Sequence, residues 1–260
     1  MIYKAEKIVP YAANEAPKSV QVERMFDEIA GKYDFLNHTL SLGIDKRWRK
    51  EGILTLRDLF PQNILDIATG TGDLALEAYR LLHPEKIVGI DISEKMMDVG
   101  REKIAQVGLA GKISFEWQNC SGLQMNDNIF DAAIMAFGIR NFENLDKSLQ
   151  EILRVLRPGG RLMFLELSTP EYFPMKQGYK IYSQLIPFIG QWISRSKAAY
   201  RYLPESIAAF PQNADLKAIM EKNGFIGTKY RKLSFGLCTL YSGEKAANCS
   251  SVSFSPSKTA

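Results

Sequence analysis

The sequence is poor in the residues that build metal sites and disulfide frameworks. Its 260 residues include three cysteines, Cys120, Cys238 and Cys249, which lie far apart and form no CxxC pair. The two histidines, His38 and His83, are 45 residues apart and equally isolated. Because a structural zinc site takes about four Cys or His ligands at short spacings, we expect neither a metal site nor a disulfide framework.

Long apolar runs are also absent. No segment approaches the roughly 18 consecutive apolar residues of a spanning helix, and the first residues, "MIYKAEKIVPYAANEAPKS", lack the apolar region of a signal peptide. The 33 basic and 29 acidic residues are interspersed, so the net charge of +4 forms no basic stripe for nucleic acid. We therefore expect a cytoplasmic protein without a nucleic-acid partner, which at most contacts the inner face of a membrane peripherally.

The sequence does contain short apolar runs that alternate with amphipathic segments. This alternation predicts a parallel, doubly wound α/β sheet with helices on both faces. The stretch "FIGTKYRKLSFGLCTLYSG", residues 225–243, predicts two strands around a turn that close the sheet as an antiparallel pair. The other predicted strands are 63–68, 86–91, 112–118, 130–137 and 160–167, and the predicted helices are 73–82, 93–108 and 144–156.

Four segments lie outside this alternation. Residues 1–20 predict an irregular arm, and residues 21–60 carry apolar residues at helical spacing, with breaks at "AGKYD" and "LGID". Residues 169–223 predict a helical, aromatic-rich insertion before the last two strands. From residue 244 the tail is small, polar and aperiodic, which predicts disorder.

A glycine-rich turn joins the first strand to its helix in "ILDIATGTGDLALEA", residues 64–78. Gly70, Gly72 and Ala75 match the pattern GxGxxG/A, and Asp91 ends the next strand about 20 residues on. This fingerprint alone permits an NAD-dependent oxidoreductase, in which a pyrophosphate rests on the helix N-terminus.

Two acids beside the glycines argue against a pyrophosphate. Asp73 begins the helix, where it would repel phosphates, and Asp66 lies inside the apolar strand, where a buried charge needs compensation. S-adenosylmethionine suits such a turn, because it has a ribose diol for Asp91, a sulfonium and an ammonium, and no phosphate. The alternative is that both acids only cap the turn and the helix.

At these residues the sequence resembles the class I S-adenosylmethionine-dependent methyltransferases. "LDIATGTGD" and "VGIDIS" are similar to their first two motifs, and "RVLRPGGRLMFLEL" is similar to the helix, turn and strand after the fourth strand. Four further stretches, "FDEIAGKYDFLNHTLSLGIDKRWR", "FGIRNF", "LELSTP" and "YRYLPESIAAFPQ", resemble the ubiquinone/menaquinone biosynthesis C-methyltransferase family. The motifs span about residues 25–243.

The resemblance implies one methyltransferase domain with a seven-stranded sheet and the transfer of a methyl group from S-adenosylmethionine to a ring carbon of a polyprenylated quinol. Among the reactions of this family, the resemblance favours the conversion of demethylmenaquinol to menaquinol. An NAD-dependent oxidoreductase, a methyltransferase for another small molecule and a protein that only binds the donor stay as alternatives. The expected parts of residues 1–243 are an N-terminal helical cap (1–60), a cofactor-binding core (61–168), an acceptor-side insertion (169–223) and closing strands (224–243), with 244–260 as the tail.

The residues and the resemblance together predict a site without a metal. The predicted cofactor-binding residues are Asp66, Gly70, Thr71, Gly72, Asp91, Asn119 and Cys120, the last through its backbone rather than its thiol. The predicted catalytic residues are Arg140 and Asn141, and the predicted substrate-side residues are Tyr33, Asp34, Tyr200 and Arg201.

Arg140 is the central mechanistic prediction. It follows the fourth strand, at the carboxyl edge where such sheets bind ligands. Phenols lose their proton near pH 10, and a guanidinium can stabilise the phenolate that makes the ring carbon nucleophilic, while Asn141 orients the quinol oxygen. The alternative is a structural pair between Arg140 and Glu143 or Asp146.

The insertion bears on the partners. Between residues 172 and 203, aromatic and aliphatic residues surround scattered Lys and Arg. This composition is typical of an amphipathic segment at a membrane surface, and equally of an ordinary helical cap. The expected partners are a polyprenylated quinol, a membrane contacted peripherally and a second copy of the chain in a homodimer.

Overall fold

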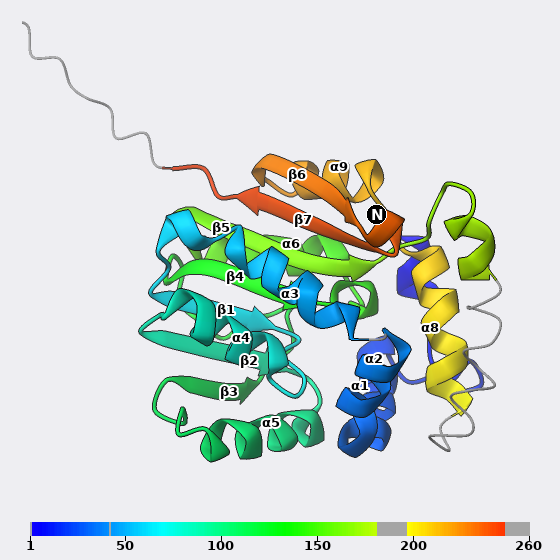
Figure 1. Ribbon diagram of the computed structural model, residues 1–260, viewed down its shortest axis with the longest axis horizontal. Helices are drawn as coiled ribbons and strands as arrows, with labels where there is room; N and C mark the ends of the chain where they lie inside the picture. The colour runs from blue at the N-terminus through cyan, green and yellow to red at the C-terminus, as the bar shows by residue number, and fades with distance from the viewer. Residues whose placement is uncertain (1, 42, 181–196, 248–260) are drawn as a thin grey trace, which may run out of the picture.

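A seven-stranded sheet forms the centre of the molecule (Figure 1). The computed structural model describes residues 2–41, 43–180 and 197–247. The strand order is β3-β2-β1-β4-β5-β7-β6; β1 to β5 are parallel, and β7 runs antiparallel to β5 and β6, which confirms the predicted fold. The strands are β1 (Asn63–Ile67), β2 (Lys86–Asp91), β3 (Ile113–Trp117), β4 (Phe130–Ala136), β5 (Leu156–Leu167), β6 (Ile226–Leu233) and β7 (Cys238–Glu244).

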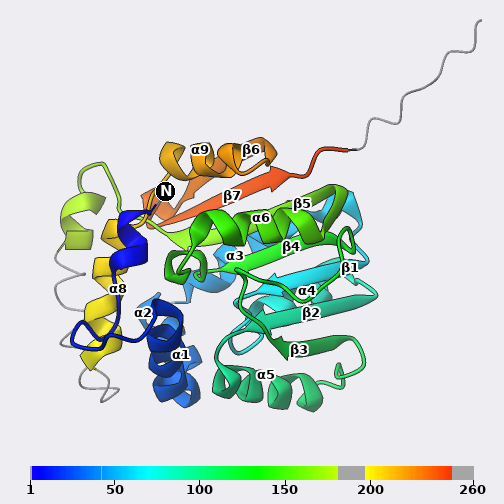
Figure 2. The ribbon, with the colours of Figure 1, turned by 180° about the vertical axis from the view of Figure 1, so that it is seen from behind.

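Helices cover both faces of the sheet (Figures 1 and 2). On one face lie α3 (Ile44–Leu54), α4 (Asp73–Leu82) and α5 (Glu94–Gln106), and on the other lie α6 (Leu145–Val155) and α9 (Ala214–Lys222). Ser93 caps the start of α5, since its hydroxyl accepts the backbone N–H of Met96 at 3.3 Å.

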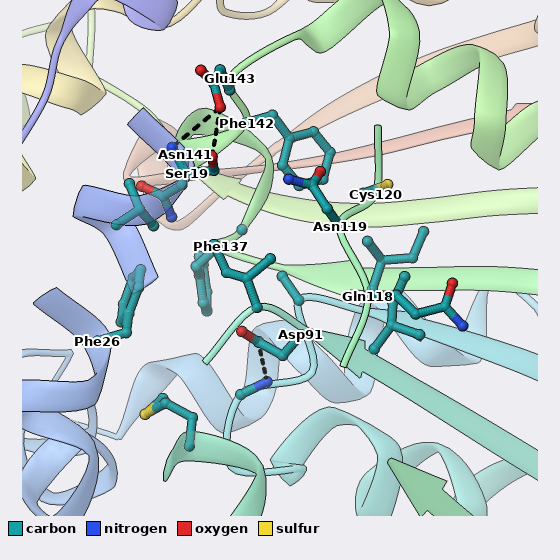
Figure 3. A pocket seen from close by; sticks show the side chains of 18 of the residues that line it. Ser19, Phe26, Asp91, Gln118, Asn119, Cys120, Phe137, Asn141, Phe142 and Glu143 are labelled. Atoms are coloured by element: carbon teal, nitrogen blue, oxygen red, sulfur yellow. Dashed lines mark hydrogen bonds between the residues drawn. The ribbon is translucent and has the colours of Figure 1, made fainter. Parts of the chain in front are cut away.

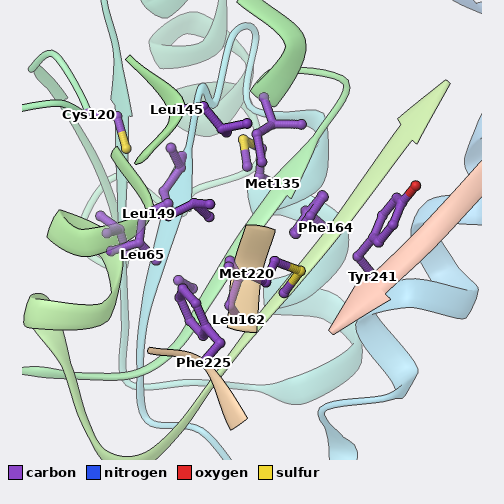
Figure 4. Packing of buried hydrophobic residues seen from close by; sticks show 14 of the residues in the cluster. Leu65, Cys120, Met135, Leu145, Leu149, Leu162, Phe164, Met220, Phe225 and Tyr241 are labelled. Carbon is purple, nitrogen blue, oxygen red and sulfur yellow. The ribbon is translucent and has the colours of Figure 1, made fainter. Parts of the chain in front are cut away.

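Each face of the sheet buries its own apolar cluster, because parallel strands are covered on both sides. In β1, Ile64 packs toward α3 and α4, whereas Leu65 packs toward α6 and α9. Figure 4 shows the second cluster, in which the rings of Phe164 and Tyr241 stack with their centroids 4.9 Å apart. The alternation of the two faces explains why the strands read as continuous apolar runs.

The N-terminal helices and α8 stand together at the carboxyl ends of the parallel strands (Figures 1 and 2). They are α1 (Lys18–Ile29), α2 (Tyr33–Leu40) and α8 (Lys197–Ala209), and Met25 of α1 packs with Tyr202 of α8. Segments far apart in the sequence therefore enclose the edge at which open α/β sheets bind ligands. Short 3-10 helices are η1 (Lys4–Lys7), η2 (Ala30–Lys32), η3 (Arg57–Leu59), η4 (Ile139–Asn141) and η5 (Ser234–Gly236).

Three predicted boundaries differ from the structure. The arm is not irregular throughout, because it contains η1 and buries Ala5 in the core. The predicted turn "RPGG" lies inside β5, which begins at Leu156. The sheet also continues past the predicted start of the tail, since β7 ends at Glu244 and the N–H of Lys245 donates to the carbonyl of Gly160 at 2.9 Å.

Residues 181–196 of the predicted insertion and residues 248–260 of the predicted tail lie outside the described residues. In the ranges that the structure does describe, no helix combines the length and apolarity needed to cross a bilayer.

Candidate functional site

Two cavities adjoin at the carboxyl ends of the parallel strands. The first is bounded by the turn after β1, the end of β2, the loop after β3 and the loop after β4 (Figure 3). The fold brings four predicted cofactor residues from separate loops into its wall, namely Gly70, Asp91, Asn119 and Cys120.

Asp91 holds the glycine turn in place. Its Oδ2 accepts the N–H of Gly70 at 2.8 Å, and its Oδ1 accepts the N–H of Ser93 at 2.9 Å. Gly70 has a φ of +55°, a conformation that favours glycine. Burial raises the pKa of Asp91, whereas the two backbone hydrogen bonds oppose that rise. Each carboxylate oxygen can accept a second hydrogen bond, so Asp91 can also bind a ribose diol.

The charge of the first cavity favours a cationic ligand. Among the described residues that line it, Asp91 and Glu143 are acidic and none is Lys or Arg. A pyrophosphate needs cations or free backbone N–H groups, and the N–H of Gly70 already binds Asp91. S-adenosylmethionine has two cationic groups and no phosphate, so these residues fit it better than a dinucleotide.

Asp73 begins α4 as predicted, but the argument from its charge was wrong. Its carboxylate is paired within the protein, with Oδ1 at 2.7 Å from Nζ of Lys103 and Oδ2 at 3.3 Å from Nη1 of Arg49. Because two cations compensate Asp73, and Asp91 belongs to the dinucleotide pattern as well, the case against a pyrophosphate depends instead on Glu143 and on the lack of Lys and Arg among the described residues of the cavity wall.

The other predicted cofactor residues lie behind the turn. Asp66 is buried, and its Oδ2 accepts the hydroxyl of Thr69 at 2.6 Å. The hydroxyl of Thr71 donates to Oδ1 of Asp34 at 2.5 Å, and Gly72, with a φ of +79°, has no room for a Cβ. Asp66, Thr71 and Gly72 therefore shape the turn rather than line the cavity.

Asn119 and Cys120 follow β3 and reach the first cavity in different ways. Oδ1 of Asn119 accepts both the N–H and the hydroxyl of Ser121 at 2.9 Å, which fixes the orientation of its amide. The Cys120 thiol lies in the core cluster of Figure 4, where burial raises its pKa. The thiol is thus a small buried group, as predicted, and only the backbone of Cys120 is suited to a ligand.

The second cavity has a volume of about 370 Å³ and is walled mostly by apolar and aromatic side chains. It lies between α1, α2, α3, α8, the loop after β4 and residues 167–179. Phe26, Tyr33 and Phe137 belong to the walls of both cavities. Since this volume falls within the range of about 300–1,000 Å³ of ligand sites, the second cavity can hold an apolar molecule beside the first.

Arg140 lines the second cavity and forms a buried ion pair with Glu166. Its Nη1 lies 2.7 Å from Oε1 of Glu166 and 2.5 Å from the carbonyl of Phe137. Its backbone N–H also donates to Glu166, at 3.2 Å from Oε2. The predicted alternative partners, Glu143 and Asp146, bind other groups, so the structural pairing of Arg140 is real but has a different partner.

Arg140 still has one buried donor to offer. Its Nε has no hydrogen-bond partner among the described residues, although the side chain is only 8% exposed. A buried N–H without a partner costs about 1–3 kcal/mol, which a ligand oxygen in the second cavity would relieve.

Asn141 belongs to the wall of the first cavity and is linked to the second. The hydroxyl of Tyr202 lies 3.0 Å from Oδ1 of Asn141, and Tyr202 lines the second cavity. The hydrogen bond between Tyr202 and Asn141 therefore spans the partition between the two ligand spaces.

The predicted substrate-side residues separate into two groups. Tyr33 and Tyr200 line the second cavity. Asp34 instead binds Thr71 and Lys103, and Arg201 is exposed and donates to the carbonyl of Pro10 at 3.3 Å, so neither lines a cavity. Within the described ranges, no three Cys, His, Asp or Glu side chains group as a metal site requires.

Sequence reasoning missed Glu166, Tyr202 and Lys18, all buried next to Arg140 or Asn141. Glu166 carries a signal that could have identified it, because it is a charged residue inside an apolar strand, like Asp66. Tyr202 lies inside the quoted stretch "YRYLPESIAAFPQ", which marks its region but not its bond to Asn141, and Lys18 has no comparable signal.

Comparison with known proteins is consistent with this site. The ubiE/COQ5 methyltransferase family matches residues 14–245. A demethylmenaquinone methyltransferase of Bacteroides fragilis is 54% identical over 94% of this chain and 100% of its own length. Its counterpart in Porphyromonas gingivalis is 47% identical over 92% and 98%. The ubiquinone/menaquinone biosynthesis C-methyltransferase UbiE of Geobacter sulfurreducens is 43% identical over 93% and 94%.

Solved structures share the fold at low sequence identity. A SAM-dependent methyltransferase from Aquifex aeolicus has a TM-score of 0.53 and 18% identity, and covers 74% of this chain and 88% of its own. A Haemonchus contortus phosphoethanolamine N-methyltransferase in complex with S-adenosyl-L-methionine has a TM-score of 0.52 and 15% identity, with coverages of 71% and 49%. These matches show the class I methyltransferase fold.

Asp66→Asn should gain stability relative to the wild type as the pH rises from about 4 to 7. Burial raises the pKa of Asp66 from 3.8 to about 7, so the folded wild type keeps a proton that the unfolded chain has released. The retained proton contributes to the free energy of unfolding of the wild type. This contribution is fully present below pH 3.8 and is lost as the pH rises through 7, with a slope of at most about 1.4 kcal/mol per pH unit. Urea unfolding at both pH values measures it.

The exposed Asp98 supplies the control for this titration, as Asp98→Asn. A stability difference between Asp66→Asn and the wild type that stays constant from pH 4 to 7 would contradict the assignment of the proton to Asp66.

Proposed function

Because the chain belongs to the ubiE/COQ5 methyltransferase family, we propose that it transfers a methyl group from S-adenosylmethionine to a ring carbon of demethylmenaquinol, forming menaquinol. The observation that carries this proposal is the pair of adjoining cavities, one acidic and one apolar, with a shared aromatic wall. A reaction between a cationic donor and an apolar acceptor needs two such spaces side by side.

The first cavity is suited to hold the donor. Asp91 accepts the ribose diol, the backbone beyond β3 at Asn119 and Cys120 borders the adenine, and Gly70 allows close approach of the turn. When bound, S-adenosylmethionine supplies an electrophilic methyl group on a sulfonium. Phe26, Tyr33 and Phe137 border both cavities and would shield the space between donor and acceptor from water.

The second cavity is suited to hold the quinol ring. Arg140 lines this cavity and has an unpartnered Nε, which would donate to an oxygen of the ring and stabilise the phenolate that develops there. Asn141, which lines the first cavity and whose Oδ1 accepts the hydroxyl of Tyr202, would orient the same group from the boundary between the cavities. The remaining wall, which includes Met25, Leu203 and Ile207, fits the apolar ring and the start of its isoprenoid chain.

Methyl transfer from labelled donor to short-chain demethylmenaquinol and to a benzoquinol, measured side by side, tests the acceptor. We expect transfer to the naphthoquinol, and we expect S-adenosylhomocysteine but not NADH to raise the Tm. A Tm shift by S-adenosylhomocysteine without transfer to either quinol would indicate a donor-binding protein or another acceptor, and would refute the proposed function.

Removal of Arg140 should abolish turnover and spare donor binding. Arg140→Ala alone would leave Glu166 buried without its cation, which costs about 3–5 kcal/mol, so the double variant Arg140→Met/Glu166→Gln is preferable. We expect kcat to fall at least about 100-fold, with the Kd of S-adenosylhomocysteine unchanged within a factor of about three.

Arg201→Ala serves as the control for Arg140, because Arg201 lies outside both cavities. The control should keep wild-type kcat. If the double variant also turned over at the wild-type rate, Arg140 would have no part in the mechanism.

We also propose that the chain meets its acceptor at an anionic membrane surface. Tyr172, Phe173 and Phe235 are 73%, 81% and 81% exposed. Nζ of Lys232 lies 5.9 Å from the ring centroid of Tyr172, which places the turn between β6 and β7 beside the start of the insertion. This aromatic and basic surface adjoins the second cavity, whose wall includes Met175 and Leu237. The homodimer stays a prediction.

The double variant Phe173→Ser/Phe235→Ser should sediment less with anionic vesicles than the wild type, because it removes the two most exposed rings of this surface. Sedimentation of the wild type should weaken as the salt concentration rises. Phe60, which is exposed and lies just before β1, supplies the control variant Phe60→Ser. Equal sedimentation of the double variant and the wild type would refute the assignment of this surface.

A further inference from the structure

Tyr3 and Glu6 of the N-terminal arm, residues 1–20, bond to the start of α6, just after the segment that carries Arg140. Oε1 of Glu6 accepts the N–H of Leu145 at 2.8 Å, and the hydroxyl of Tyr3 donates to Oδ1 of Asp146 at 2.8 Å. Ala5 is buried in the same core cluster as α6. The arm is therefore a fixed part of the site's surroundings.

Lys18, the first residue of α1, joins this arm to Arg140 itself. Its Nζ donates to the carbonyl of Ala5 at 2.8 Å and to the carbonyl of Arg140 at 3.1 Å. The next residue, Ser19, donates its hydroxyl to Oε2 of Glu143 at 2.6 Å. Two successive residues of α1 thus bind the loop between β4 and α6.

The η4 turn is consequently held from three directions. Glu166 of β5 binds the side chain and the backbone N–H of Arg140, Tyr202 of α8 binds the side chain of Asn141, and Lys18 binds the carbonyl between them. Without Lys18, the peptide group that links Arg140 to Asn141 loses its contact with the arm.

We propose that Lys18 is a positioning residue, which holds the carbonyl of Arg140 so that Arg140 and Asn141 keep their places at the two cavities. This inference rests on the proposed methyl transfer, because it assigns Lys18 a role in turnover. It extends the functional unit beyond the sheet to the N-terminal arm.

The surroundings of Lys18 indicate that its ammonium acts as a hydrogen-bond donor and that the side chain does more than fill a volume. The residue is 4% exposed, and its two acceptors are neutral carbonyls. Its pKa is lowered to about 8, mainly by burial and in part by Arg140, while Glu6 and Glu143 oppose the shift. An apolar side chain would fill the same volume without the desolvation of an ammonium, so the contribution of Lys18 is its hydrogen bonds.

Lys18→Met tests the inference, with the exposed Lys7 of the same arm changed to Met as the matched control. Hydrogen exchange of the peptide that covers residues 137–142 should be about tenfold faster in Lys18→Met and unchanged in Lys7→Met. Turnover should follow, with kcat lowered about tenfold and the Kd of S-adenosylhomocysteine unchanged. Tyr3→Phe, which removes only the bond to Asp146, should give a smaller effect of the same kind.

Exchange and turnover separate the outcomes. Unchanged exchange of residues 137–142 in Lys18→Met would overturn the inference, and so would faster exchange with wild-type kcat. If the wild type itself transferred no methyl group to a quinol, the proposed function would fail, and the exchange data would still decide whether Lys18 holds the turn. If Lys18→Met did not fold, a Tyr3→Phe variant with wild-type exchange and kcat would overturn the role of the arm.

Discussion

The ion pair between Arg140 and Glu166 is the interaction on which the site depends, because it joins the carboxyl ends of β4 and β5 at the boundary of the two cavities. Buried pairs need good geometry to offset desolvation, and Glu166 meets this requirement by also accepting the backbone N–H groups of Arg140 and Leu167. The arginine is thereby held in one orientation. Its Nη1 binds Glu166 and the carbonyl of Phe137, and its buried Nε has no hydrogen-bond partner among the described residues.

The fold could be read from the sequence because its determinants are local. Apolar runs and glycine turns each mark an element from a few neighbouring residues. Asp91 and Gly70 were identifiable for the same reason, since a parallel sheet brings every strand end to one edge. The prediction that they share one cavity needed no knowledge of packing beyond that rule.

Ion-pair partners that lie far apart in the sequence could not be predicted from neighbouring residues. The register pairs Ala136 with Leu165, which places Glu166 beside the turn of Arg140, and nothing near Arg140 in the sequence encodes this register. The acids weighed for Arg140, Glu143 and Asp146, were those nearby in the chain. The error over Asp73 has the same origin, because its cations come from α3 and α5. Electrostatic arguments from sequence fail where compensation is long-range.

The pairing also bears on why carbon rather than oxygen receives the methyl group. An apolar cavity raises the pKa of a quinol hydroxyl, so an ionised oxygen there needs a donor. Because Glu166 already neutralises Arg140, the catalytic role proposed for the guanidinium depends on a hydrogen bond from its unpartnered Nε more than on net charge. An oxygen bound to Nε has its electron pair engaged by the protein, whereas the adjacent ring carbon keeps the electron density that the phenolate delocalises onto it. A directed hydrogen bond therefore both promotes ionisation and disfavours attack through oxygen.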